Sequence, residues 1–166
     1  MPRTYLPVET ILAILKETPS RLTTLSAGLS PTQLHTATEP GEWSASEVLA
    51  HLRACSDVWG DYYIMTILTQ DAPAIKAVNP RRWIKDTDYL AQDFHTSLNA
   101  FTRQREKLLA VLEQRTPQDW LRTATLIGAG KPLQQTLLTH ADGLARHERA
   151  HLKQIERTLK AVRSSG

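Results

Sequence analysis

Two histidines, His147 and His151, stand four residues apart in the stretch HERAH near the C-terminus. On a helix, residues four apart lie one above the other, with about 5–6 Å between their Cβ atoms. Two imidazoles at that spacing can reach one metal ion with bonds of about 2.0–2.1 Å. The stretch therefore predicts a pair of metal ligands. The alternative interpretation is a pair of helix histidines whose side chains are merely hydrogen-bonded.

The same stretch spells H-E-x-x-H, the pattern of one class of zinc proteases. A protease of that class takes its third ligand from downstream, for example in the longer pattern H-E-x-x-H-x-x-G-x-x-H. Here Gln154 stands at the glycine position and Arg157 at the position of the third histidine. The sequence argues against a protease. We expect Glu148 to lie beside the ligands or in the pocket, with a place facing a neighbouring helix or solvent as the alternative.

A third candidate ligand, His51, lies on a different predicted helix. It belongs to a face whose members step by three and four: Val48, His51, Cys55, Val58 and Tyr62. Buried imidazoles need partners for both ring nitrogens, and several in one core are costly unless something satisfies them together. A metal ion held by His51, His147 and His151 would do so.

Two further residues near this site have other expected roles. His140 precedes His147 by seven residues, about 10 Å along a helix axis. It cannot share an ion with both other histidines of its helix, so we interpret it as a pocket residue or a neighbour of the ligands. The single cysteine, Cys55, is expected to be a buried small side chain, with a nucleophile as the alternative.

Four segments with apolar residues at helical spacing predict an all-α protein, because no alternating β-branched run persists. The expected helices cover residues 8–28, 44–70, 86–115 and 132–162. Ser44 and Glu47 form a capping box at the start of the second helix, and Asp86 is expected to cap the third. Between the helices, residues 71–85 are predicted to form a loop, and residues 121–132 irregular chain or a short hairpin.

Length and composition indicate one domain over residues 1–166. Of these residues, 41% are hydrophobic and 22% charged, as in ordinary soluble proteins. No apolar run approaches the ~20 residues of a membrane span, and the N-terminus lacks a signal pattern, so we expect a cytoplasmic protein. The net charge is +3, but the basic runs at 81–85 and 103–107 are short and typical of solvated helix faces, which disfavours nucleic-acid binding.

With these residues in view, the chain resembles the DinB/YfiT-like superfamily over most of its length. GEWSASEVLAHL (41–52) is similar to that family's first motif, in which a Trp-Ser pair opens a helix and a histidine about eight residues later is a ligand. THADGLARHERAHLKQI (139–155) is similar to the second, H-x6-H-x3-H followed by a glutamine three positions on. Lys153 departs from the family pattern, because many members have glycine there.

The resemblance implies a four-helix bundle that binds a divalent metal, often zinc or nickel, through His51, His147 and His151. His140 and Gln154 match common family positions, and both are expected beside the ligands or in the pocket. Three imidazoles plus water form an open site, and the family includes thiol-dependent transferases. We therefore expect a metal-dependent hydrolase or low-molecular-weight thiol S-transferase that uses a metal-bound water or thiolate. The alternative is a non-catalytic stress-response or binding module with a structural metal.

The expected partners are a small-molecule substrate, such as a low-molecular-weight thiol, and a second copy of the chain. A second apolar stripe, formed by Trp59, Tyr63, Ile64 and Ile67, suggests a homodimer. Trp83, with Arg81 and Arg82, is expected either at the mouth of the pocket or as a core anchor for its loop.

Overall fold

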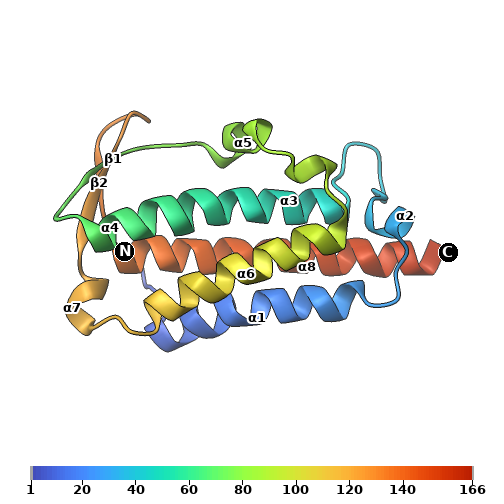
Figure 1. The fold of residues 1–166 in the computed structure, drawn as a ribbon, viewed down its shortest axis with the longest axis horizontal. Coiled ribbons are helices and arrows are strands. Elements are labelled where there is room, and N and C mark those ends of the chain that lie inside the picture. Colours follow the sequence, from blue (N-terminus) through green and yellow to red (C-terminus); the bar gives the residue numbers. More distant parts are fainter. Residues whose placement is uncertain (1, 166) are drawn as a thin grey trace.

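The computed structural model describes residues 2–165 and is a four-helix bundle with a small sheet at one end (Figure 1). The long helices are α1 (Val8–Ser26), α6 (Phe94–Leu112), α8 (Leu137–Ser165) and a composite of α3 (Ala45–Cys55), the π-helix η1 (Ser56–Ile64) and α4 (Met65–Thr69). Short helices connect them: α2 (Pro31–Leu34), α5 (Pro80–Trp83), η2 (Ile84–Asp86), η3 (Tyr89–Ala91) and α7 (Pro117–Trp120). The predicted four-helix bundle is confirmed. No helix in the described range is long and apolar enough to cross a membrane.

The sheet is a local departure from the all-α expectation. Its strands are β1 (Ala74–Lys76), β2 (Thr123–Ile127) and β3 (Leu133–Thr136), with β1 parallel and β3 antiparallel to β2. The hairpin expected at 121–132 therefore exists, but it extends to residue 136. Because Leu133–Thr136 pair with β2, α8 begins five residues later than the predicted start at Pro132. Strands of three to five residues are too short to show a reliable alternation in the sequence.

The order of helix directions follows from a long crossover between the second and third long helices. In Figure 1, α1 and α8 run away from the sheet, whereas α3 and α6 both run towards it. The chain between α4 and α6 returns along α3 through α5, η2 and η3. Asp57 on η1 holds this crossover, because its Oδ2 accepts bonds from Trp83 Nε1 (3.0 Å) and the Tyr89 hydroxyl (2.6 Å). The crossover thus lies against the helix that carries His51.

The crossover also explains why the third long helix begins later than predicted. Asp93, not Asp86, caps α6, and its side chain accepts a bond of 2.8 Å from the Thr96 backbone N–H. Asp86 lies in η2, and Leu90 in η3 is 56% exposed. The tie between Tyr89 and Asp57 keeps this segment along α3, so a tertiary contact outweighs the helical spacing of Tyr89 and Leu90.

The π-helix η1 changes which residues face the core. Tyr62, predicted to point inward, is 39% exposed, whereas Tyr63 is only 4% exposed. A π-helix closes each turn from residue i to i+5, so the buried face moves on by one residue. Ile64 and Ile67 are buried for the same reason. The stripe that suggested a homodimer is therefore mostly core, and dimerisation stays a prediction without that support.

The core consists of two apolar clusters with a polar layer between them. The cluster near the sheet is centred on Ile11, Leu15, Ile64, Leu108, Leu112 and Leu144, and the distal one on Leu22, Leu49, Leu52, Phe94, Phe101, Ile155 and Leu159. Between them each long helix contributes a buried polar residue: Thr18, Ser56, Arg105 and Glu148. The candidate site lies at this same level of the bundle.

Candidate metal centre

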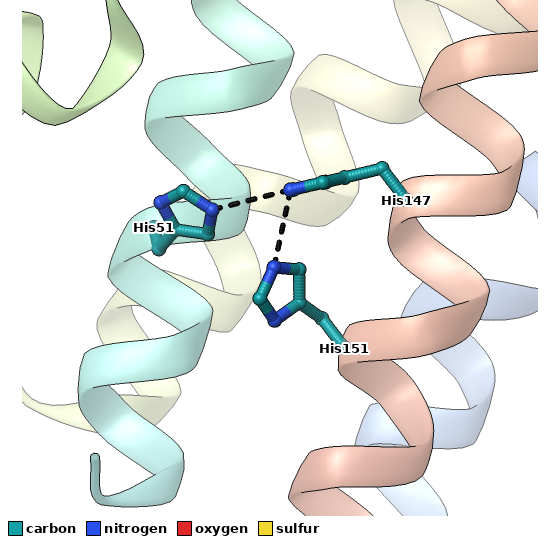
Figure 2. Close-up of side chains that lie close together, drawn as sticks. All are labelled: His51, His147 and His151. Atoms are coloured by element: carbon teal, nitrogen blue, oxygen red, sulfur yellow. Dashed lines mark hydrogen bonds between the residues drawn. The ribbon is translucent and has the colours of Figure 1, made fainter. Parts of the chain in front are cut away.

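Two antiparallel helices bring the three predicted histidines together. The capping box of α3 is present, with Ser44 Oγ accepting from the Glu47 N–H (3.2 Å) and the Glu47 side chain accepting from the Ser44 N–H (3.1 Å). This fixed start places His51 two turns into α3, where it faces α8. Figure 2 shows His51 pointing from α3 towards His147 and His151 on α8.

The ring nitrogens of the triad are spaced as the ligands of one ion would be. His147 Nε2 lies 3.3 Å from His51 Nε2 and 3.1 Å from His151 Nε2. One donor atom from each ring lies within 4.8 Å of the other two. A tetrahedral ion with bonds of about 2.05 Å separates two donors by about 3.3 Å. The donor set therefore fits a divalent ion.

The protonation states of the rings also suit a metal. Gln154 Oε1 lies 2.7 Å from His151 Nδ1, and because an amide oxygen only accepts, this nitrogen must carry the proton. With its proton on Nδ1, the ring in its neutral form presents a lone pair at Nε2. Burial, followed by the charges of His151 and Arg81, lowers the pKa of His51 to about 4. Burial and the charges of His151, His51 and Arg81 lower the pKa of His147 to about 4, so both rings are neutral near pH 7.

The triad cannot satisfy its own nitrogens. Two neutral imidazoles share one proton in an N–H···N bond, so three Nε2 atoms in contact leave at least one without a matching partner. Such converging, unsatisfied lone pairs are costly in a protein interior unless a cation binds them.

No fourth histidine, cysteine or carboxylate side chain joins the group within residues 2–165. Cys55 Sγ lies 3.5 Å from His51 Nε2 but does not reach the other two histidines closely enough to belong to the set. Burial, with the charge of Glu148, raises the pKa of the Cys55 thiol to about 12. Cys55 is thus the buried small side chain that the sequence predicted, and its thiol is protonated near pH 7. Structural zinc sites are closed by four protein ligands, whereas catalytic ones have three and an open position.

Two tryptophans flank the triad. The Trp43 ring stacks on the His151 ring, with 6.5 Å between the ring centroids and an interplanar angle of 13°. The centroid of the His51 ring lies 5.2 Å from that of Trp43. Trp59 meets His147 edge to face at 4.9 Å, a position that depends on the register of η1. Both tryptophans thus lie next to the imidazoles of the triad. Neither was singled out as a site residue from the sequence, because the α-helical spacing put Trp59 on another face.

Two cavities lie on either side of the triad. The larger, of about 630 Å³, includes Trp43, Arg81, His151, Gln154 and Arg157 in its lining. The smaller, of about 300 Å³, is lined by His140 and His147 together with Trp59, Tyr63 and Leu144. The structure therefore places His140 in a pocket next to a triad member. Burial lowers the pKa of His140 to about 4, and its Nε2 has no partner among the described residues.

Glu148, the middle residue of the H-E-x-x-H pattern, faces away from the triad. Both of its oxygens bind the Arg105 guanidinium, through Nη1 at 2.7 Å and through Nη2, and Thr18 Oγ1 donates to Oε1 at 3.0 Å. Arg105 Nη1 also donates to the Leu15 carbonyl at 2.9 Å. Glu148 thus faces neighbouring helices and not solvent. The prediction of a solvated run at 103–107 is wrong for Arg105, which continues the apolar stripe of Phe101 and is buried.

Trp83 takes neither of its two predicted places. Trp83 is 40% exposed and its indole N–H donates to Asp57, so it is no core anchor. It is also not among the described residues that line the two cavities. Arg81, two residues earlier in α5, lies at the larger cavity instead, with its guanidinium 5.4 Å from the Trp43 ring centre. Residues two apart on a helix point in different directions, so the two cannot share one role.

Comparison with known proteins shows which family this chain is similar to in sequence and fold. Residues 14–155 match the model of the DinB superfamily. Two Geobacillus proteins named "Putative metal-dependent hydrolase" are similar: one from G. thermodenitrificans (29% identity, covering 77% of this chain and 71% of the relative) and one from G. kaustophilus (28%, covering 89% and 82%). In fold, the chain is similar to YfiT from Bacillus subtilis, described as a probable metal-dependent hydrolase with an unusual four-helix bundle topology (TM-score 0.76, 22% identity, covering 95% of this chain and 90% of YfiT). The chain belongs to the DinB superfamily.

Proposed function

We propose that the protein is a metal-dependent hydrolase whose divalent ion is held by His51, His147 and His151. The observation that carries the proposal is the convergence of three Nε2 atoms beside two cavities, with no fourth histidine, cysteine or carboxylate ligand in the described chain. The Geobacillus relatives named as metal-dependent hydrolases support it. Zinc is the favoured metal, because three nitrogen donors and one open position match its catalytic sites, and nickel is the second choice.

The chain's own residues have definite parts in this proposal. A divalent ion in an open three-histidine site acts as a Lewis acid and lowers the pKa of bound water to about 7. Gln154 holds the proton of His151 on Nδ1 and so keeps the Nε2 lone pair directed at the centre. Burial keeps His51 and His147 neutral, which is the state that binds metal. Trp43 and Trp59 lie next to the rings.

A structural metal in a non-catalytic module is the competing interpretation. Such a site would be expected to contain a fourth protein ligand, for which a carboxylate or the Cys55 sulfur was the candidate. Cys55 stays outside the donor set and Glu148 is engaged by Arg105. These positions favour the open, catalytic kind of site.

Metal content tests the ligand set. Protein purified without a His tag is expected to hold about one divalent ion per chain, measured by elemental analysis, and His51→Ala to lose most of it. His95→Ala is the matched control, because His95 is an exposed histidine of α6 outside the triad. Full metal retention in His51→Ala would contradict a site shared by two helices.

Turnover tests the reaction. The metal-loaded protein is screened against ester, amide and phosphoester substrates, and against electrophiles with glutathione, bacillithiol or mycothiol as co-substrate. Turnover by hydrolysis alone supports the hydrolase, whereas turnover that requires the thiol would indicate an S-transferase. Activity should disappear in His151→Ala while the helical circular dichroism signal remains. An equally active His151→Ala variant would remove the basis of the proposal.

A further inference from the structure

The larger cavity beside His151 contains two arginines that the fold leaves available. Arg81 comes from α5 on the crossover and Arg157 from α8, six residues after His151. Within residues 2–165 neither takes part in an ion pair, whereas Arg105 and Arg146 are both paired with carboxylates. Both arginines are exposed, and both line the cavity. Two cations from separate elements therefore border the same space as a proposed metal ligand.

The rest of the lining suits one end of a small polar molecule. Trp43 provides an aromatic face on which the Arg81 guanidinium lies, which leaves the N–H edge of that group free to donate. Glu42 is the single acidic residue of the lining, so the charged side chains sum to one excess positive charge without counting the ion. The volume of about 630 Å³ is within the range of small-molecule sites.

Arginine is suited to this role because of its shape. The planar guanidinium presents a fork of N–H donors that matches the oxygens of a carboxylate or a phosphate. An anionic group held there would lie on the His151 side of the triad, and the remainder of the same molecule would extend towards the three Nε2 atoms. An uncharged substrate would leave both guanidinium groups with water alone as a partner.

We infer that the substrate carries an anionic group, a carboxylate or a phosphate, that docks between Arg81 and Arg157 while its reacting bond lies at the histidine triad. This inference rests on the proposed function, because it assigns the substrate class of that same site. Arg81 acts as the contact from the crossover and Arg157 as the contact from α8. The crossover thereby takes part in substrate selection.

Equilibrium binding tests the inference without catalysis. The probes are succinanilic acid and butyranilide, which share the anilide and the chain length and differ in a carboxylate against a methyl group. Calorimetry on the metal-loaded protein should give at least about tenfold tighter binding of the acid, the effect of a charge-assisted contact. Arg81→Met and Arg157→Met should each reduce that preference about tenfold. Inorganic phosphate and acetate, as competitors, distinguish a phosphate site from a carboxylate site by which displaces the acid at lower concentration.

Matched controls separate a specific contact from general charge. Arg82→Met and Arg149→Met remove exposed arginines of α5 and α8 that do not line this cavity, and should leave the preference unchanged. An equal effect of all four substitutions would overturn the inference. So would the lack of any preference for the acid in the unmodified protein, including the lack of binding of either probe at 10 mM, a concentration about 10 times a millimolar dissociation constant.

The two proposals fail in different ways. If the preference for the acid depends on Arg81 and Arg157 but no ester is hydrolysed, the anion site stands and the hydrolase falls. If p-nitrophenyl butyrate and p-nitrophenyl hemisuccinate are hydrolysed with the same kcat/KM, and Arg157→Met changes neither, the hydrolase stands and the anion site falls.

Discussion

Two polar centres lie side by side in the middle of this bundle, and they differ in how far their polar atoms have hydrogen-bond partners. In the pair of Arg105 and Glu148, both carboxylate oxygens are bonded to the guanidinium, Thr18 also donates to the carboxylate, and Arg105 donates to the Leu15 carbonyl. Of the polar atoms of this pair, Arg105 Nε alone has no partner among the described residues. The triad of His51, His147 and His151 is open: its nitrogens converge without a proton for each and border two cavities. The first is equipped to stabilise the fold, the second to bind an ion.

The contrast shows what the H-E-x-x-H letters mean in this chain. In zinc proteases, the glutamate of that pattern acts as a general base beside the metal. His147 and Glu148 are consecutive residues, so about 100° of helix rotation separates their side chains. The rotation sends His147 towards α3 and Glu148 towards α1 and α6. One pattern therefore contributes to two centres, and the glutamate is held by Arg105, away from the proposed metal.

The largest expected effect comes from breaking the pair of Arg105 and Glu148. Glu148→Gln should lower the free energy of unfolding by about 3–5 kcal/mol, because it leaves the buried Arg105 charge without its partner. Urea unfolding of the metal-free protein measures it. Glu156→Gln is the control, since Glu156 pairs with Arg21 on the surface and its loss should cost under ~1 kcal/mol. Equal small losses in both variants would mean that the buried pair contributes no more than a surface one.

Acid should destabilise the folded protein between about pH 6.5 and pH 4, through the buried histidines at and beside the triad. The folded-state pKa of His140 is lowered by burial to about 4, against about 6.5 in the unfolded chain. Only the unfolded state binds the proton between these values, so the stability is complete above pH 6.5 and falls as the pH drops to 4. His140 alone should contribute roughly 2–3 kcal/mol to that loss.

Urea unfolding of the metal-free protein at pH 7.5, 6, 5 and 4 measures the acid effect. His51 and His147, with pKa values lowered in the same direction, should add to the slope. His140→Leu should flatten the curve. The same pH dependence in His140→Leu and in the unmodified protein would show that His140 already binds its proton in the folded state.

The smallest expected effect concerns how strongly the histidine triad binds zinc. Gln154→Ala should weaken zinc binding by about 10–100-fold, because His151 loses the acceptor that fixes its tautomer. Competition with a chromogenic chelator measures the affinity. Lys153→Ala, which changes the exposed neighbouring residue, should bind zinc as the unmodified protein does. Unchanged affinity in Gln154→Ala would show that the ring keeps its orientation without the amide.

Local patterns in the sequence were sufficient to predict the long helices of the bundle and the candidate metal ligands. Apolar residues three and four apart predict the long helices, and the capping box at Ser44 predicts the start of α3, because both depend on neighbours within one or two turns. The i, i+4 spacing of His147 and His151 and the inward face of His51 selected the residues that α3 and α8 bring together. Sequence spacing also carried a signal for Arg105, which continues the stripe of Phe101, but the surrounding charges concealed it.

The tertiary structure decided everything that depends on contacts between distant segments. The π-helix turns Tyr63 inward and Tyr62 outward. The residue types did not predict it, because no particular residue pattern is required for its i to i+5 bonds. Asp57 holds Tyr89 and Trp83 against α3, which delays α6 and brings Arg81 to the cavity. The partner of Glu148 lies 43 residues away, on another helix. A helical period tells which side of a helix is buried, whereas only the packed bundle determines what that side meets.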